Sequence, residues 1–316
     1  MRPVSLLLCA LLLLTVSCRL ESGGESPLAL EWAAFQGNGP TLLVDDDGAD
    51  CQNADFATIQ AAVDAAEAYI TILVCAGTYN ERVLITGPDK TGLRVRAHGA
   101  PDAVVLDGIG LPPPGPPGSP TGNHGFHLRN VSEVLIEGFT LRRYFENIRL
   151  TDATDSRIRK NRTSAAGHDG INLTNSTRNI VEHNESFDNL SGNACGVLLA
   201  LASTDNIIRH NEFRNNNWGI RVVGASANNY VFGNYSHENR TRGIQNIGAA
   251  AARTVIENNR TERNPVGIEV GAPGVTVARN RSFLNTTFDI VNTGLGNTFF
   301  NNHCDTSDPA GLCTNS

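Results

Sequence analysis

A short pattern of glycine, apolar, polar and apolar residues recurs between residues 125 and 292 of the 316-residue chain. In Gly170-Ile171-Asn172-Leu173, the period of two places Ile171 and Leu173 on one face of a strand and Asn172 on the other. The first apolar position returns every 22 to 26 residues, at Phe126, Ile148, Ile171, Val197, Ile220, Ile244, Ile268 and Ile290, with Asn147 and Asp289 replacing the glycine in two repeats. Repeats of this length are typical of a solenoid, in which each repeat forms one coil.

A second apolar pair followed by asparagine completes the repeat. In the coil of Ile171 this pair is Ile180 and Val181, which begin a second strand. The asparagine recurs at Asn161, Asn184, Asn211, Asn234, Asn259, Asn280 and Asn302, with Gly138 in its place in the first coil. Asparagine tolerates left-handed backbone conformations, and its amide can bond the backbone of adjacent coils, so we predict a ladder of asparagines at a sharp turn.

One such coil cannot bury an apolar face alone, so the coils must stack, with each strand paired in parallel to its equivalents about 4.8 Å away. We therefore predict an all-β fold, a single-stranded right-handed parallel β-helix whose interior holds aligned apolar side chains. Five turn asparagines also begin Asn-x-Ser/Thr triplets, namely Asn161, Asn184, Asn234, Asn259 and Asn280. Because the triplet follows from the coil register, we expect most of these asparagines to be structural and unmodified.

The segment ahead of the coils predicts a helix over residues 58–66, between strands at residues 42–44 and 70–74. The apolar stripe of this helix consists of Ile59, Ala62, Val63 and Ala66. An open solenoid end would expose strand edges and core, so we expect this N-terminal α-helix to cap the stack.

This region resembles the start of the pectin-lyase-like β-helix superfamily. The resemblance lies in Phe56-Ala57-Thr58-Ile59-Gln60-Ala61-Ala62-Val63, Ile72-Leu73-Val74 and Ala76-Gly77-Thr78-Tyr79-Asn80-Glu81-Arg82-Val83. With the coils it covers roughly residues 41 to 303 and implies the fold, but no particular activity. The catalytic segments of pectin methylesterases and polygalacturonases have no match here, and copper-delivery relatives need thioether ligands, whereas Met1 is the one methionine.

The N-terminus predicts export. Arg2 precedes an apolar run from Val4 to Val16, which indicates a signal peptide over residues 1–17. Thr15-Val16-Ser17-Cys18 resembles the bacterial lipobox, which implies lipidation of Cys18, and residues 18–40 then form a flexible tether. We expect a protein anchored by lipid alone in the bacterial cell envelope, at the outer membrane or cell surface, or otherwise periplasmic or extracellular.

Export permits disulfides, and we expect two local pairs. Cys51 and Cys75 flank the first helix, Cys304 and Cys313 flank a short turn at the chain end, and Cys195 is left as a buried thiol. The formal net charge of −7 excludes the basic surface that nucleic acid binding needs. We expect a monomer.

The rest of the chain divides into four parts. These are the N-terminal cap with the first coils (residues 41–110), a proline-rich loop (111–120), the regular β-helix coils (121–303) and a disulfide-closed tail (304–316). The run Asp45-Asp46-Asp47-Gly48-Ala49-Asp50 lacks the alternation of an EF-hand, so we interpret it as a strand-to-helix turn, with calcium as the lesser alternative. We expect no other metal or cofactor.

Outward residues one coil apart should form columns along the solenoid. The first three coils thereby bring together His124, His127, Glu146, Arg149, His168, Asp169 and Asn172. Trp218, Arg221 and Arg242 continue the same face, where an aromatic ring and two cations can bind a sugar chain. We expect His124, Asn172, Trp218, Arg221 and Arg242 to bind substrate.

The remaining residues of this patch suit acid–base chemistry on a polysaccharide. His127 or His168, Glu146 or Asp169, and Arg149 could fill the roles this chemistry needs. For a uronate lyase or epimerase, we assign His127 as the base, Arg149 as the carboxylate clamp, and Glu146 or Asp169 as a tuning partner. For a glycosidase, Glu146 and Asp169 would be the paired carboxyl groups. The alternative is that these charges satisfy one another. We therefore expect an envelope protein that binds, and in the enzymatic version modifies, an extracellular polysaccharide, with a non-catalytic scaffold or adhesin as the rival.

Overall fold

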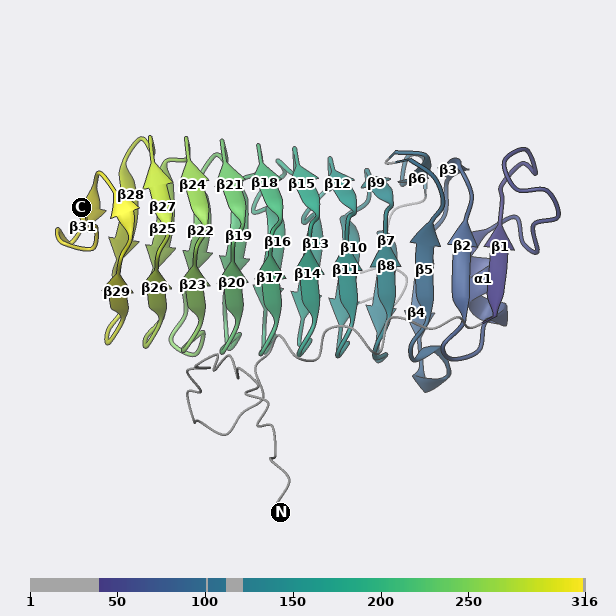
Figure 1. Ribbon diagram of the computed structural model, residues 1–316, viewed down its shortest axis with the longest axis horizontal. Helices are drawn as coiled ribbons and strands as arrows, with labels where there is room; N and C mark the ends of the chain where they lie inside the picture. Colours follow the sequence, from purple (N-terminus) through teal and green to yellow (C-terminus); the bar gives the residue numbers. More distant parts are fainter. Residues whose placement is uncertain (1–39, 101, 112–121, 315–316) are drawn as a thin grey trace, which may run out of the picture. The chain divides into compact units, whose positions relative to one another are not determined.

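The computed structural model describes residues 40–100, 102–111 and 122–314, all within one compact unit, residues 34–316. Their strands stack into three parallel sheets, which we call A, B and C (Figure 1). In each regular coil the chain runs through sheet C, then A, then B. This arrangement is the predicted all-β, right-handed parallel β-helix.

The strands are short and are distributed evenly over the three sheets. Sheet A contains β1 (Thr41–Val44), β2 (Thr71–Val74), β5 (Arg94–Ala97), β8 (Leu135–Glu137), β11 (Arg157–Arg159), β14 (Ile180–Glu182), β17 (Ile207–Arg209), β20 (Tyr230–Phe232), β23 (Val255–Glu257), β26 (Thr276–Ala278) and β29 (Thr298–Phe300). Sheet B contains β3 (Gly77–Tyr79), β6 (Val104–Asp107), β9 (Thr140–Arg142), β12 (Arg162–Ser164), β15 (Glu185–Phe187), β18 (Glu212–Arg214), β21 (Tyr235–His237), β24 (Arg260–Glu262), β27 (Arg281–Phe283) and β30 (His303–Cys304). Sheet C contains β4 (Val83–Thr86), β7 (His124–Arg129), β10 (Glu146–Thr151), β13 (Ile171–Thr174), β16 (Cys195–Ala200), β19 (Trp218–Val222), β22 (Arg242–Asn246), β25 (Val266–Val270), β28 (Phe288–Asn292) and β31 (Ser307–Asp308).

The register of sheet C confirms that residues one repeat apart are stacked neighbours. Ile171 pairs with Ile148 on one side and with Val197 on the other, and Val197 pairs in turn with Ile220. The same alignment continues to Ile290. The sequence period is therefore a physical adjacency.

The stack is longer than the eight coils that the motif identifies. Val83 of β4 pairs with Phe126, and Ser307 of β31 pairs with Ile290. Val83 lies 43 residues before Phe126, because the chain between them includes the loop at residues 111–120, and this insertion hides the period.

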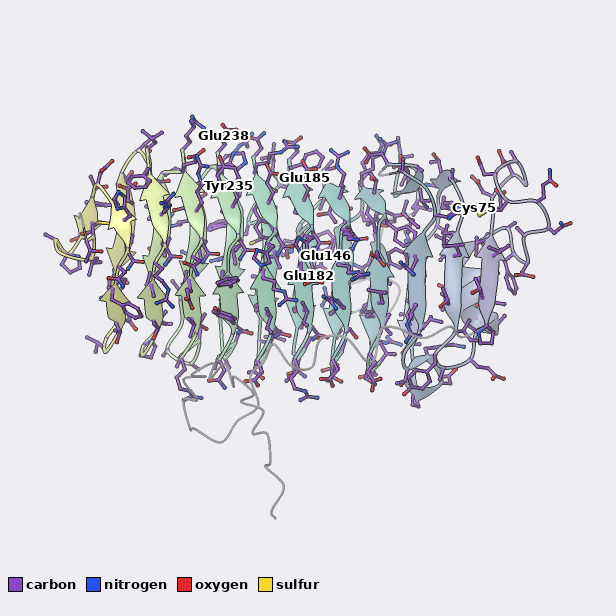
Figure 2. All side chains as sticks on the ribbon, in the orientation of Figure 1. Cys75, Glu146, Glu182, Glu185, Tyr235 and Glu238 are labelled. Carbon is purple, nitrogen blue, oxygen red and sulfur yellow. A yellow bond between two sulfur atoms is a disulfide. The ribbon has the colours of Figure 1, made fainter. Side chains whose placement is uncertain are left out.

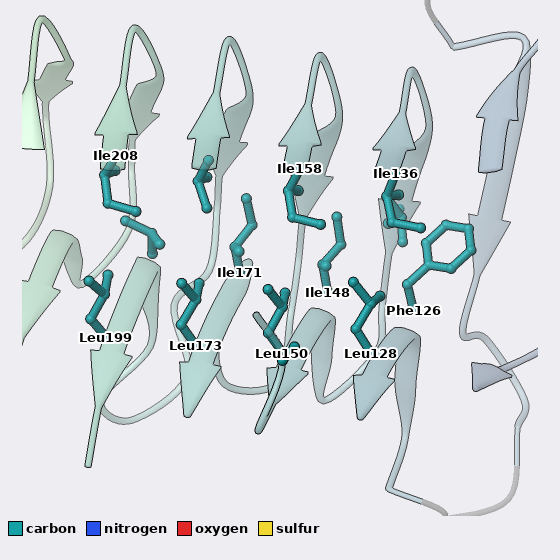
Figure 3. Close-up of a cluster of buried hydrophobic side chains, with 14 of the residues drawn as sticks. Phe126, Leu128, Ile136, Ile148, Leu150, Ile158, Ile171, Leu173, Leu199 and Ile208 are labelled. Atoms are coloured by element: carbon teal, nitrogen blue, oxygen red, sulfur yellow. The ribbon is translucent and has the colours of Figure 1, made fainter. Parts of the chain in front are cut away.

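The interior is filled by aligned apolar side chains (Figure 3). One row consists of Leu128, Leu150, Leu173 and Leu199, which pair in consecutive strands of sheet C. All four side chains are fully buried. Each contributes on the order of 2 kcal/mol of hydrophobic stabilisation, so the core is held by stacking and not by any single coil.

The turn asparagines form the predicted ladder between sheets A and B. The backbone N–H of Asn161 donates to Oδ1 of Asn184 (2.9 Å), and the N–H of Asn184 donates to Oδ1 of Asn211 (2.9 Å). Because each amide bonds the next coil, the ladder satisfies backbone groups that a buried turn would leave unpaired.

Two further ladders, which the sequence analysis missed, occupy the other two corners of the coil. They consist of Asn179, Asn206 and Asn229, and of Asn189, Asn216, Asn239, Asn264 and Asn285. Their members stand five residues before or after a member of the predicted ladder, since a strand of three residues separates successive corners. This five-residue spacing is the signal in the sequence that identifies them.

The strands of sheet B, also not predicted, explain the Asn-x-Ser/Thr triplets. In Asn184-Glu185-Ser186, Asn184 is the ladder residue, Glu185 points outward, and Ser186 points inward and is fully buried. The Ser186 hydroxyl donates to the carbonyl oxygen of Gly196 (3.1 Å). The triplet is therefore a consequence of the turn and the strand that follows it, and Asn184 has a structural role.

The motif glycine is required by the close approach of this serine position. A Cβ at Gly219 would overlap the Ser236 hydroxyl and the carbonyl oxygen of Gly243. Ser236 donates to that same carbonyl (2.8 Å). Only a residue without a side chain leaves room for this bond.

The N-terminal helix α1 (Ile59–Ala65) begins after the N-cap Thr58, whose hydroxyl accepts from the N–H of Ala61. Ile59, Ala62 and Val63 are buried in the core beside the first strands. A single 3₁₀ turn, η1 (Pro88–Lys90), follows β4.

The disulfides pair the cysteines as the sequence predicts, Cys51 with Cys75 and Cys304 with Cys313. Cys195 is a buried free thiol. Burial and the neighbouring Asp169 carboxylate raise its pKa well above the ordinary value, so it is an unreactive thiol at neutral pH.

Several predictions fall on residues that the structure does not describe. The signal peptide (1–17), the lipidated Cys18 with most of the tether (18–40), and residues 112–120 of the proline-rich loop lie outside the described ranges. No helix among the described residues is long and apolar enough to cross a membrane.

Candidate functional site

Both predicted columns exist in sheet C. Arg149 is flanked by His127 and Asn172 in the adjacent strands, and Glu146 pairs with His124. Asp169 lies in the next coil, where its carbonyl oxygen accepts from the N–H of Asn147. Residues separated by a full coil in the sequence therefore meet on the outer side of one sheet.

Glu146, at the start of β10, is labelled in Figure 2. Its contacts make it the centre of this patch. Its Oε2 accepts from Nη1 of Arg149 (2.7 Å) and lies 3.3 Å from Nδ1 of His124. Its Oε1 lies 3.5 Å from Nδ1 of His168. One carboxylate thus faces three nitrogen groups.

Asp169 holds the other side of His168. Its Oδ2 lies 2.7 Å from Nδ1 of His168 and accepts from Nδ2 of Asn172 (2.8 Å). Its Oδ1 accepts from the backbone N–H of Cys195 (2.8 Å). The carboxylate is therefore fixed by partners on two coils.

We define the seven residues His124, His127, Glu146, Arg149, His168, Asp169 and Asn172 as the Glu146 cluster. The cluster lies on the outer side of sheet C and not in the apolar interior, but most of its side chains are buried. The Glu146 side chain is 2% exposed and Asp169 is fully buried, whereas Arg149 is 25% exposed and His168 is 32% exposed. A substrate from solvent therefore meets Arg149 and His168 first, with the carboxylates beneath them.

The neighbouring carboxylates control the protonation of His168. Asp169 and Glu146 raise the pKa of His168 to about 10, against the opposing effect of burial. Burial by itself would raise the pKa of Glu146, but His168, Arg149 and His124 outweigh it, so the pKa lies below its ordinary value. At neutral pH the cluster therefore holds a protonated imidazole over an ionised carboxylate.

The other two histidines are neutral at pH 7, because their surroundings lower their pKa values instead of raising them. Burial, together with nearby positive charge, lowers the pKa of His124 to about 4 and that of His127 to about 3. His127 Nε2 contacts the Thr151 hydroxyl (3.1 Å), and the His127 ring lies edge-on to that of His124, with 5.0 Å between centroids. A neutral imidazole can accept a proton, but a pKa of about 3 makes His127 a weak base.

The low pKa of His127 predicts a loss of stability in acid. The unfolded chain takes up a proton near pH 6.5 and the folded chain only near pH 3, so stability falls as the pH drops below 6.5. At pH 5 this amounts to about 2 kcal/mol. Urea unfolding at pH 8 and pH 5 should show a smaller acid-induced loss for His127→Gln than for the unaltered protein. Equal losses in the two proteins would contradict the assignment.

The residues predicted as a sugar subsite lie together further along the face, but their charged groups already bond other side chains. The Arg221 guanidinium lies 4.6 Å from the Trp218 ring centroid, and its Nε donates to Gln245 (2.8 Å). Arg242 donates to Glu269 (2.6 Å). This group is separated from the Glu146 cluster by one coil, which contributes the buried residues Cys195 and Leu198.

Two features beside the cluster were not assigned to it from the sequence. Phe145 stacks on the His168 ring, with 5.3 Å between centroids and 10° between planes, and is 43% exposed. The inserted turn at residues 187–194 lies at the same place, since the Ser191 hydroxyl donates to the carbonyl of Gly167. Phe145 precedes Glu146 directly, but no period marks it, because its neighbours in the column differ in type.

A surface hollow of about 390 Å³ lies elsewhere, at the corner between sheets A and B. It is lined by His183, Asn184, Glu185, His210, Asn211, Glu212, Gly233 and Tyr235. The His183 and His210 rings stack with 5.4 Å between centroids. The Glu146 cluster is not part of this hollow.

The acidic run near the N-terminus forms the predicted turn. The Asp45 carboxylate accepts from the backbone N–H groups of Asp47, Asp50 and Cys51. These bonds lower the pKa of Asp45 and give its carboxylate a structural role in the turn. Asp45, Asp46 and Asp47 also bring three carboxylate oxygens close together. Calcium binding at this turn stays an untested alternative.

Known proteins share the fold of this chain. The family described as "Right handed beta helix region" matches residues 119–259, and no curated protein matches the sequence. A pectate lyase structure aligns with a TM-score of 0.66 at 14% identity, covering 90% of this chain and 83% of the lyase. The A-module of a mannuronan C-5 epimerase from Azotobacter vinelandii aligns with a TM-score of 0.56 at 18% identity, covering 79% of this chain and 83% of the module. A polygalacturonase from Erwinia carotovora aligns with a TM-score of 0.63 at 8% identity, covering 85% of this chain and 81% of the enzyme. At these identities the likeness shows the fold, in agreement with the resemblance to the pectin-lyase-like superfamily.

Proposed function

We propose that this protein binds an acidic extracellular polysaccharide along the outer face of sheet C and modifies it at the Glu146 cluster, as a uronate lyase or epimerase. The observation that carries the proposal is the pair of solvent-reaching cations, Arg149 and protonated His168, above buried carboxylates. Both cations contact the Glu146 carboxylate, so they lie close enough together to suit the carboxylate of a uronate, and they can stabilise the negative charge that develops there when the adjacent carbon loses a proton.

Phe145 supports a sugar ligand at the same place. Its exposed ring is held by stacking on His168 and offers an apolar surface next to this cation. Sugar-acting enzymes are among the solved structures that share this fold, which supports a polysaccharide as the ligand. The two disulfides and the lipobox-like segment at Cys18 support a site of action outside the cytoplasm.

The protonation states favour elimination or epimerisation over hydrolysis. A glycosidase needs one carboxyl group that is protonated at working pH, whereas the pKa of Glu146 is lowered. In the proposed reaction Arg149 clamps the uronate carboxylate and His168 supplies the acid. His127, the base assigned from the sequence, is neutral and 7% exposed, and its low pKa makes it the weakest member of this scheme.

A non-catalytic scaffold or adhesin is the second candidate. The favouring observation is that the cations of the later coils are already paired, Arg221 with Gln245 and Arg242 with Glu269. A face whose charges satisfy one another can bind a polymer weakly without turning it over.

The test is incubation of the protein with polygalacturonate, alginate and a neutral glucan. Unsaturated uronate ends, detected by ultraviolet absorbance, report a lyase, and proton NMR of the polymer reports an epimerase. Arg149→Gln should lower the rate about 100-fold, since it removes a charged group that stabilises the transition state. Arg240→Gln, a change of an exposed arginine outside the cluster, should leave the rate unchanged. Polymer binding without any product, unaffected by Arg149→Gln, would establish the adhesin instead.

A further inference from the structure

We propose that Glu146, His168 and Asp169 form a binding site for a divalent first-row transition metal ion of the Zn²⁺ or Mn²⁺ type. Each residue offers one donor atom, and the three atoms lie within 4.8 Å of one another. The inference goes beyond the proposed polysaccharide activity, in which His168 is the acid of the metal-free protein. A bound ion takes the place of the Nδ1 proton, so His168 fills one role or the other at a time. The inference also departs from the sequence analysis, which expected no metal here.

The spacing of the donors matches that of ligands around a common ion. Metal–ligand bonds of about 2.1 Å that meet at octahedral or tetrahedral angles place neighbouring donor atoms about 3.0 to 3.4 Å apart. Nδ1 of His168 lies 2.7 Å from Oδ2 of Asp169 and 3.5 Å from Oε1 of Glu146. One observed separation is therefore slightly shorter than the expected range and the other is slightly longer.

The direction of the imidazole gives independent support. Nδ1 of His168 is buried and forms ion pairs with two carboxylate oxygens, but it meets neither of them in good hydrogen-bond geometry. The oxygens therefore do not lie along the ring N–H direction. An ion that displaces the Nδ1 proton can therefore approach the nitrogen along that direction, with the carboxylates on either side.

The carboxylates are oriented by a surrounding set of partners. Arg149 occupies Oε2 of Glu146, and Nδ1 of His124, which is buried and has no hydrogen-bond partner, lies against the same oxygen. The N–H of Cys195 occupies Oδ1 of Asp169. Each carboxylate thus turns its other oxygen toward His168, which is how outer partners position ligands in protein metal sites.

The donor set selects the class of metal. One imidazole and two carboxylates suit first-row divalent ions such as Zn²⁺, which takes imidazole and carboxylate ligands, and Mn²⁺, which takes carboxylates, whereas Ca²⁺ takes six to eight oxygen ligands. The His168 side chain is 32% exposed, so water or a ligand can complete the coordination. The site therefore resembles an open site and not a closed structural one.

The test is calorimetric titration of the chelator-treated protein with ZnCl₂, MnCl₂ and CaCl₂, without polysaccharide. We expect one Zn²⁺ per chain, weaker Mn²⁺ binding in line with the general order of affinities, and no Ca²⁺ binding. His168→Gln and Asp169→Asn should each weaken Zn²⁺ binding at least about 100-fold. Asn172→Ala, which removes a bond to Asp169, should weaken it about tenfold.

The exposed His183 and His210 pair provides the control, because surface imidazoles also bind Zn²⁺. The double change His183→Ala with His210→Ala should leave Zn²⁺ affinity unchanged. Zn²⁺ binding that disappears with this change, or that persists in a folded His168→Gln protein, would overturn the proposal, as would Ca²⁺ binding of equal strength. Circular dichroism and urea midpoints establish that each variant is folded. Polymer binding by the metal-free protein is measured separately, so failure of the metal site and failure of the proposed function are distinguishable.

Discussion

Replacement of Asn211 by alanine is expected to lower the free energy of unfolding by about 4 kcal/mol. The side chain is 2% exposed and stands in the middle of the predicted ladder. Its Nδ2 donates to the carbonyls of Val181 and Arg209 and to Oδ1 of Asn234. Its Oδ1 accepts from the backbone and side-chain nitrogens of Asn184. Alanine would leave several of these buried groups without a partner, and each costs about 1 to 3 kcal/mol.

Two control substitutions test whether the loss of stability comes from the hydrogen bonds of the ladder. Asn193→Ala makes the same substitution at an exposed position for which no side-chain hydrogen bond is found, so it should alter stability by less than about 0.5 kcal/mol. Asn302→Ala removes the end of the ladder, where the side chain makes three bonds and not five, and should cost about half as much as Asn211→Ala.

Urea unfolding followed by circular dichroism measures the three variants against the unaltered protein. Because a solenoid can unfold in segments, the transition midpoint and its slope are compared together. Asn211→Ala and Asn193→Ala proteins with the same midpoint would contradict the role assigned to the ladder.

Replacement of Glu146 by alanine in metal-free protein is expected to cost about 3 kcal/mol of stability, because it leaves buried positive and polar groups without their common partner. The side chain is 2% exposed and contacts Arg149, His124 and His168. His124 has no route to solvent, since it is itself 5% exposed.

Glu269→Ala is the control for this change. Glu269 lies on the same face of sheet C and pairs with Arg242, but it is 17% exposed and its partner is 29% exposed. A pair of this kind is worth less than about 1 kcal/mol. Unfolding midpoints that shift equally in Glu269→Ala and Glu146→Ala would show that burial does not increase the contribution of Glu146 to stability.

Much of the fold follows from spacing in the sequence. The recurrence of Ile171, Val197 and Ile220 predicts their register, because parallel pairing of equivalent strands is the one arrangement that buries every repeat. The strands of sheet B escape this reasoning. Most of them are three residues long with one inward residue, such as Ser186, so they lack the apolar alternation that identifies a strand.

The sequence by itself determined which residues of the candidate site meet, since Arg149 and Asn172 are neighbours in any stack that pairs equivalent strands in register. Only the tertiary structure decided that Glu146 is buried while Arg149 and His168 reach solvent, and that Nδ1 of His168 faces two fixed carboxylates. The reason is physical. A period fixes the positions of the backbone along the coil, whereas burial and the direction of a side chain depend on rotamers and on inserted turns, such as residues 187–194, that follow no period.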